Sequence, residues 1–138
     1  LVLISMSFSL NLSSSNEEAY ELISEWKLCN IERSSSPSRR IESEIINLTN
    51  VFNQYKDVNS STAISKIENY ILSKDRFTCY EKVNLSNIYA ASLNLEGDHE
   101  KSLALYGRIK NYRGLDKGFI NNTTGLYKGF ILEKKIHG

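Results

Sequence analysis

Apolar residues recur at helical spacing along most of this chain, and short polar or glycine-containing stretches separate the apolar runs. Ile41, Ile45, Leu48 and Tyr55, for example, lie three, four or seven positions apart, a spacing that places side chains on one face of an α-helix. No run alternates apolar and polar residues as a half-buried strand does. The pattern therefore predicts helices over about 17–31, 38–56, 61–74, 78–96, 98–111 and 117–135.

The residues at the ends of these runs are typical of helix ends. Ser38 and Thr78 each precede a run, and their hydroxyl groups can accept hydrogen bonds from the first backbone amides of a helix. Glu81 follows Thr78 by three residues, which predicts a reciprocal capping box. Gly97 is expected to end one helix and Asp98 to cap the next.

Small residues recur where two of the predicted helices would cross. The Gly97-Asp98 turn is flanked by two small residues, Ala90 and Ser102, and by the aromatic Tyr106. A shift of 39 residues aligns Ala63 with Ser102 and Ile67 with Tyr106. Because a single helical hairpin cannot bury its own apolar face, this repetition indicates stacked hairpins.

At these positions the chain resembles a tetratricopeptide (TPR) repeat. That family places a small residue late in its first helix, a Gly-Asp type of turn, and then a small and an aromatic residue in its second helix. Two departures mark a divergent member: the period is 39 rather than about 34 residues, and Ser86 stands where the family has an aromatic residue. The resemblance implies an all-α fold of antiparallel helical hairpins, stacked as a short right-handed TPR-like α-solenoid. The hairpins would cover about 39–74 and 78–111, with a partial third from 117.

A narrower resemblance links the second hairpin to periplasmic TPR proteins associated with TonB-type energy transduction in gammaproteobacteria. It is carried by Thr78-Cys79-Tyr80-Glu81-Lys82, by Tyr89, and by the stretch from Gly97 to Ser102. It implies a scaffold or adaptor in an envelope complex.

In TPR proteins the exposed positions of each first helix form a concave face that binds ligands. Carried onto this chain, the resemblance implies a partner-binding face of Asn84, Asn87, Ile88, Ala91, Asn94, Leu95, Thr123, Tyr127, Phe130 and Lys134. The asparagine side chains on this face could hydrogen-bond the backbone of a bound peptide. The alternative is plain surface asparagine.

The first fifteen residues differ from the rest. Leu1–Leu10 is an apolar run too short to span a bilayer, and Ser13–Ser15 follows it. This order is typical of a secretory signal and its cleavage zone, so residues 1–15 are expected to be a signal remnant and 16–138 the helical repeat domain. The alternatives are a buried first strand or helix and a cytoplasmic protein.

The cysteines Cys29 and Cys79 stand 50 positions apart, with no clustered cysteine or histidine, so we expect no zinc site. In a periplasmic or secreted protein the two would be candidates for a disulfide. Otherwise both are small buried hydrophobic residues.

Charge carries little information over the whole chain, where the net value is +1. From Lys101 onward, however, the sequence contains eight basic residues and two acidic ones. A solvated helix surface is the simplest interpretation. The alternative function is an intracellular helical regulator that binds nucleic acid or an acidic partner through this region.

No arrangement of residues typical of an enzyme or a cofactor site is found. His99 falls in a predicted turn and His137 at the end of the sequence, and no glycine-rich loop or nucleophile motif is present. We therefore expect a non-catalytic protein-protein interaction module that takes no cofactor and has no membrane span.

Overall fold

The computed structural model describes residues 17–122, 125 and 129. Within this part of the chain the protein is all-α, with no named strand. Helices α2 (Arg39–Tyr55) and α3 (Ser60–Leu72) form one antiparallel pair, and α4 (Cys79–Leu95) and α5 (His99–Ile109) form another. Helical residues 17–25 precede them, and a further helical segment begins at 117.

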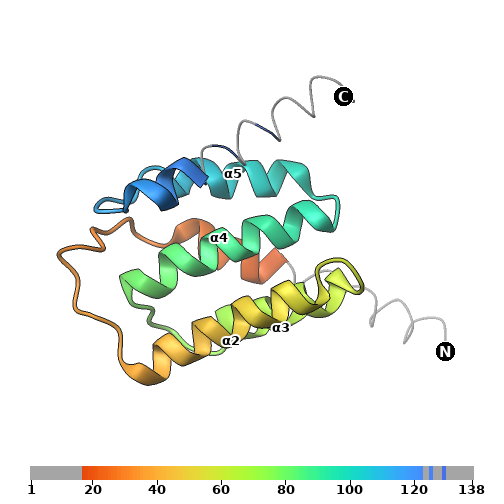
Figure 1. Ribbon diagram of the computed structural model, residues 1–138, viewed down its shortest axis with the longest axis horizontal. Coiled ribbons are helices and arrows are strands. Elements are labelled where there is room, and N and C mark those ends of the chain that lie inside the picture. The colour runs from red at the N-terminus through yellow and green to blue at the C-terminus, as the bar shows by residue number, and fades with distance from the viewer. Residues whose placement is uncertain (1–16, 123–124, 126–128, 130–138) are drawn as a thin grey trace.

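Helix α4 is the centre of the fold. It packs against α2, α3 and α5, and in Figure 1 it lies between the α2–α3 pair and α5. Leu85, Tyr89 and Ala90 are fully buried on this helix. Because the residues of α4 are buried on several sides, its apolar residues form no single stripe.

The helix ends follow the sequence signals in most cases. Ser38 accepts a hydrogen bond from the Ile41 amide, and Thr78 and Glu81 form the complete capping box. Gly97 has φ = 88°, a left-handed conformation that glycine adopts without strain. Asp98 is the N-cap residue of α5, but its side chain makes no capping hydrogen bond. Its carboxylate instead lies 3.6 Å from Lys101 Nζ.

The predicted first helix is too long. Helical residues end at 25, and residues 26–38, which we call the strap, run without regular structure to α2. The apolar spacing up to Ile31 was misleading, because the strap is fixed by contacts distant in sequence. The Ile31 amide donates to the Arg113 carbonyl at 2.9 Å, and the Arg113 amide donates to the Cys29 carbonyl at 3.0 Å.

The segment 17–25 belongs to the core. Ala19 and Ile23 are fully buried in the main apolar cluster, and Glu17 pairs with Lys101 of α5 at 2.5 Å. Lys101 also lies over the ring of Tyr20. Among the described residues, no helix combines the length and the apolar character that crossing a membrane requires. The predicted signal remnant, residues 1–15, lies outside the described residues.

Candidate functional site

Most of the half-exposed residues of α4 lie in one narrow stripe. Residues Tyr80, Asn84, Asn87, Ala91 and Asn94 are half-buried, at spacings of four, three, four and three residues. These spacings place them on one face of the helix, while the flanking positions are mostly buried. We call these five residues the α4 stripe.

The partner-binding residues that the sequence placed on α4 are divided by the structure. Asn84, Asn87, Ala91 and Asn94 share the α4 stripe, and Leu95 is exposed at the last position of the helix. Ile88 is 8% exposed and belongs to the main apolar cluster, so it does not share the surface of the other residues. Tyr80 was not anticipated, although it lies one turn before Asn84. The remaining predicted residues, Thr123, Tyr127, Phe130 and Lys134, lie outside the described residues.

The amide groups of the stripe are only partly engaged. Asn84 Nδ2 donates to the Tyr80 carbonyl at 2.8 Å, and His99 Nδ1 lies 2.6 Å from Asn94 Oδ1. Asn87 Oδ1 is shielded from solvent and has no hydrogen-bond partner among the described residues. A buried acceptor without a donor costs free energy. Asn87 Oδ1 is thus an unmet acceptor below the surface of the stripe, and a bound group can reach it only if the side chain turns outward.

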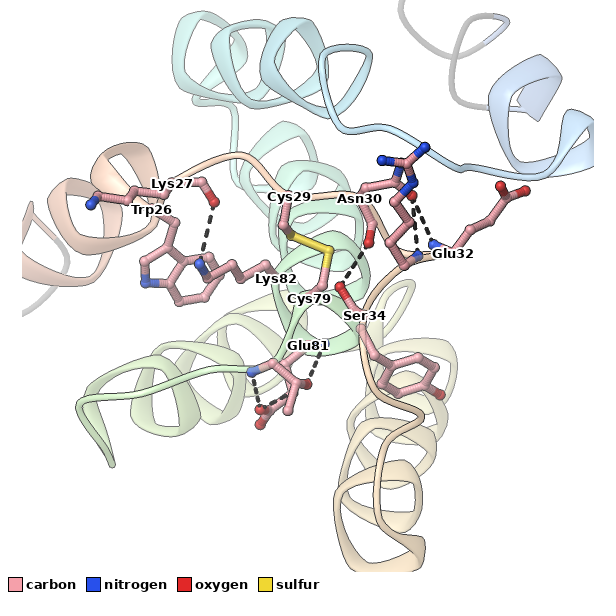
Figure 2. Close-up of a disulfide and its surroundings, with 12 residues drawn as sticks. Trp26, Lys27, Cys29, Asn30, Glu32, Ser34, Cys79, Glu81 and Lys82 are labelled. Carbon is pink, nitrogen blue, oxygen red and sulfur yellow. Dashed lines mark hydrogen bonds between the residues drawn. A yellow bond between two sulfur atoms is a disulfide. The ribbon is translucent and has the colours of Figure 1, made fainter.

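A disulfide joins the strap to the first residue of α4. Cys29 Sγ and Cys79 Sγ are bonded, with Cα atoms 6.0 Å apart (Figure 2). Lys82 Nζ donates to the Lys27 carbonyl at 3.2 Å beside this bond. Trp26 packs against Phe77 with ring centroids 4.7 Å apart and ring planes tilted by 40°. The strap is thus covalently and sterically held against the helices.

Glycine at position 114 lets the strap approach the chain after α5. Gly114 has φ = 76°, and a Cβ atom there would lie 2.4 Å from Asn30 Oδ1 and 2.8 Å from the Glu32 amide nitrogen. Asn30 Oδ1 itself accepts hydrogen bonds from the Glu32 and Arg33 amides. Both the backbone angle and the close contact require glycine here.

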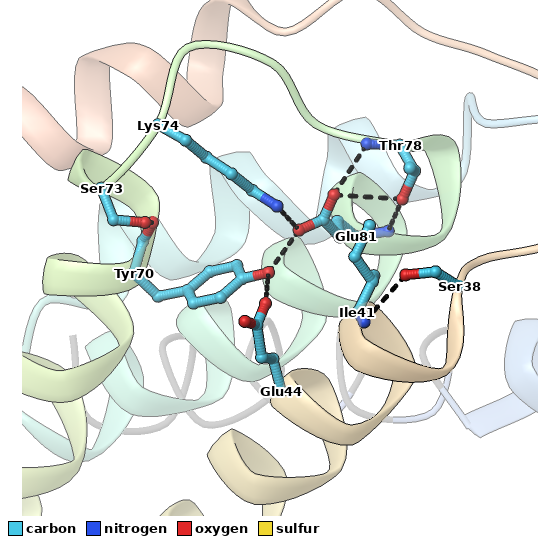
Figure 3. Close-up of polar contacts among 8 residues, drawn as sticks. All are labelled: Ser38, Ile41, Glu44, Tyr70, Ser73, Lys74, Thr78 and Glu81. Carbon is cyan, nitrogen blue, oxygen red and sulfur yellow. Dashed lines mark hydrogen bonds and ion pairs between the residues drawn. The ribbon is translucent and has the colours of Figure 1, made fainter.

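A polar cluster lies where α2, α3 and the start of α4 meet (Figure 3). Glu81 has no exposed side-chain surface and pairs with Lys74 at 2.5 Å. Glu81 Oε1 accepts from the Thr78 amide at 2.9 Å, whereas Tyr70 donates to Oε2, the oxygen that pairs with Lys74. Burial raises the pKa of Glu81, but the bonds from Lys74, Tyr70 and Thr78 outweigh burial and hold that pKa below its ordinary value. Glu81 is therefore an anion that organises this corner of the fold.

Tyr70 also reaches a second carboxylate. Its hydroxyl oxygen lies 2.9 Å from Glu44 Oε2 on α2. Burial and the two carboxylates together raise the pKa of Tyr70, so the phenol stays neutral. A cleft of about 430 Å³ opens beside this contact. Its lining residues are Arg40, Glu44, Asn47, Leu48, Val51, Tyr70, Ser73 and Lys74.

A second buried carboxylate lies between α3 and α4. Glu68 is 4% exposed and accepts a hydrogen bond from the Tyr89 hydroxyl at 2.8 Å. Burial raises the pKa of Glu68, against the opposing effects of Tyr89 and Lys101. Tyr89 and Glu68 border a cavity of about 350 Å³, which the carboxylates of Glu17, Glu96 and Asp98 line together with the cation Lys101.

The basic residues of the second half are partly engaged within the fold. Lys101 pairs with Glu17, and Arg108 donates to the Trp26 carbonyl. Arg113 and Lys117 are exposed, while Lys128, Lys134 and Lys135 lie outside the described residues. The described part of this region therefore presents less free positive charge than its sequence suggests, and nucleic-acid binding stays a prediction.

Comparison with protein-family models, with curated proteins and with solved structures found no match to this chain. The helical fold is thus established from the structure itself, and the resemblance to TPR proteins stays a prediction.

Proposed function

We propose that this protein is a non-catalytic interaction module that binds a protein partner through the α4 stripe. The observation that carries the proposal is the stripe itself. It is the one face of α4 that its neighbours in the described residues leave half-exposed along the helix, and it presents amide and phenol groups together with a small residue, Ala91. Such groups can bond both the donors and the acceptors of a partner's backbone.

The unpartnered Asn87 Oδ1 supports a ligand with hydrogen-bond donors. A turn of the Asn87 side chain that brings Oδ1 to the surface would let a partner's backbone N–H bond it, which would remove an existing desolvation cost. A short side chain at Ala91 leaves room for close approach of that backbone. By contrast, the buried carboxylates Glu81 and Glu68 already have partners within the fold, which suits a structural role better than acid-base catalysis.

The disulfide between Cys29 and Cys79 supports an oxidising compartment, because such bonds persist outside the reducing cytosol. We therefore propose a periplasmic or secreted location, in which the module acts as a scaffold or adaptor of an envelope complex such as a TonB-type transport system.

The test compares two alanine-to-arginine variants in co-purification from native cells, with quantitative mass spectrometry of the recovered proteins. Ala91→Arg puts a long charged chain on the α4 stripe, whereas Ala104→Arg puts the same chain on an exposed position of α5. We expect Ala91→Arg to lose a partner that wild type and Ala104→Arg retain, with all three proteins folded by circular dichroism. Equal recovery of the same partners by both variants would count against the α4 stripe.

A further inference from the structure

The Tyr70 hydroxyl lies near two carboxylates but can donate a hydrogen bond to only one of them. Tyr70 carries a single hydroxyl hydrogen, yet carboxylate oxygens of both Glu44 and Glu81 lie within hydrogen-bonding distance. Glu81 is the fully buried carboxylate, and its ionised form depends on donors. With the hydrogen directed to Glu81, Glu44 Oε2 and the phenol oxygen face each other at 2.9 Å with lone pairs only.

In the described part of the chain, no neighbouring side chain other than Tyr70 is placed to donate a hydrogen bond to Glu44. Lys74 is directed to Glu81 at 2.5 Å, and its ammonium group also lies over the rings of Tyr70 and Phe77, 5.2 Å and 5.3 Å from their centroids. Within residues 17–122, Glu44 makes no ion pair, and Arg40 in the same cleft makes none either. The half-buried Glu44 carboxylate therefore has unused capacity to accept hydrogen bonds.

This corner already binds one ammonium group from within the chain. Lys74 Nζ is held by a buried carboxylate and by two aromatic faces, which is the usual set of partners for such a cation. On the cleft side, Glu44 offers a second carboxylate and the Tyr70 oxygen offers a lone pair. Leu48 and Val51 line the same cleft and provide apolar surface for an alkyl chain.

We propose that the cleft between α2 and α3 binds a primary alkylammonium group, with the ammonium donating to Glu44 and to the Tyr70 oxygen. Two sources share this chemistry: a lysine side chain of a partner protein and a free alkylamine. The proposal uses residues of α2 and α3 and does not rest on the α4 stripe, so either can fail without the other.

The positive charge of Arg40 distinguishes a bound cation from a bound anion. It lies one turn before Glu44 on α2 and lines the same cleft. A bound cation is repelled by Arg40, so its removal should tighten the binding of an amine. A bound anion would be attracted by Arg40, and the same change would weaken its binding.

The experiment is a titration followed by two-dimensional NMR of the ¹⁵N-labelled oxidised protein at constant ionic strength. The probes are n-butylamine hydrochloride and, as the matched neutral molecule, 1-butanol. A second pair, Nα-acetyl-lysine N-methylamide and Nα-acetyl-norleucine N-methylamide, represents a side chain in a peptide. We expect saturable shifts at the amides of Glu44, Val51 and Tyr70 with both amines and not with the neutral molecules.

The variants test each partner. Glu44→Gln should weaken amine binding about tenfold, the worth of a charge-assisted hydrogen bond, while Glu42→Gln, the same loss of charge at an exposed position of α2, should leave it unchanged. Arg40→Gln should tighten it about twofold. Tighter binding of the lysine derivative than of butylamine assigns the site to a partner's side chain, and equal binding assigns it to a free amine. The proposal is overturned if butanol binds as well as butylamine, if Glu42→Gln and Glu44→Gln have equal effects, or if Arg40→Gln weakens binding.

Discussion

Ser102 Oγ lies 2.6 Å from the backbone carbonyl oxygen of Ala90 and donates a hydrogen bond to it. Both residues are fully buried, and they join α5 to α4 at the place where these two helices cross. Only a small side chain fits at such a crossing. The sequence therefore carried this contact in the identity of two small residues twelve positions apart.

The crossing makes a sharp prediction for stability. Ser102→Lys should destabilise the protein by more than about 3 kcal/mol, because a long charged chain would enter a closed helix interface. Ala104→Lys, two residues later on the exposed side of α5, should stay within about 0.5 kcal/mol of wild type. Urea unfolding followed by circular dichroism measures both. Similar midpoints for the two variants would contradict the close packing of α5 against α4 at Ser102.

Substitution by alanine should raise the stability at Gly107 and lower it at Gly114. Gly114→Ala should cost on the order of 1–3 kcal/mol, because the added Cβ meets Asn30 and the backbone of Glu32 and because φ is positive. Gly107→Ala lies within α5 and meets nothing within 4 Å, so it should stabilise by about 0.5–1 kcal/mol. Thermal melts of the two variants test this, and a stable Gly114→Ala protein would contradict the described packing of the strap.

Reduction of the disulfide should lower the stability markedly. Cys29 and Cys79 close a loop with a sequence separation of 50, and the chain-entropy relation gives about 4 kcal/mol for a loop of this length. Denaturant unfolding with and without a phosphine reductant measures the effect. The double variant Cys29→Ala/Cys79→Ala is the control, because the reductant should not change its midpoint.

The two buried carboxylates predict opposite dependences on pH. The folded-state pKa of Glu81 lies below its ordinary value of 4.5, so its contribution is present above that pH and is lost as the pH falls through the folded pKa. Glu81→Gln should therefore cost about 2 kcal/mol at neutral pH, the loss expected for hydrogen bonds to a charged group, and the difference in stability from wild type should narrow in acid. Unfolding curves between pH 7 and strongly acidic conditions test the trend.

The stability that Glu68 contributes should change with pH in the opposite direction. Its folded-state pKa is raised above 4.5 by burial, so the stability it contributes is present below 4.5 and is lost as the pH rises through the folded pKa. Glu68→Gln should match or exceed wild type at neutral pH, by up to about 1 kcal/mol, and still accept the Tyr89 hydrogen bond. A marked loss of stability in Glu68→Gln at neutral pH would show that the charge itself is required.

Local signals in the sequence predicted the helices well. The capping box of Thr78 and Glu81, the cap at Ser38 and the turn at Gly97 depend on residues three or four positions apart, so they could be found along the chain. The path of the strap could not be predicted from local signals. Its path is fixed by Cys79, Arg113 and Gly114, which lie far from it in sequence, and the helical spacing of apolar residues up to Ile31 gave no warning of them.

The candidate sites show the same division. The resemblance to TPR proteins implied that Asn84, Asn87, Ala91 and Asn94 share one exposed face, and all four are half-buried at helical spacing; their binding of a partner stays a prediction. Ile88 was misplaced, because α4 packs against neighbours on several sides and its burial depends on them. The cluster of Glu44, Tyr70, Lys74 and Glu81 joins three helices, and only the capping role of Glu81 had a local signal.

Site-specific photo-crosslinking in native cells measures whether the α4 stripe contacts a partner protein. A photoreactive phenylalanine analogue replaces Ala91 on the stripe or, as the control, Ala104 on α5. We expect a discrete adduct of one partner from position 91 and none from position 104. The absence of an adduct at position 91, or the same adducts from both positions, would contradict it.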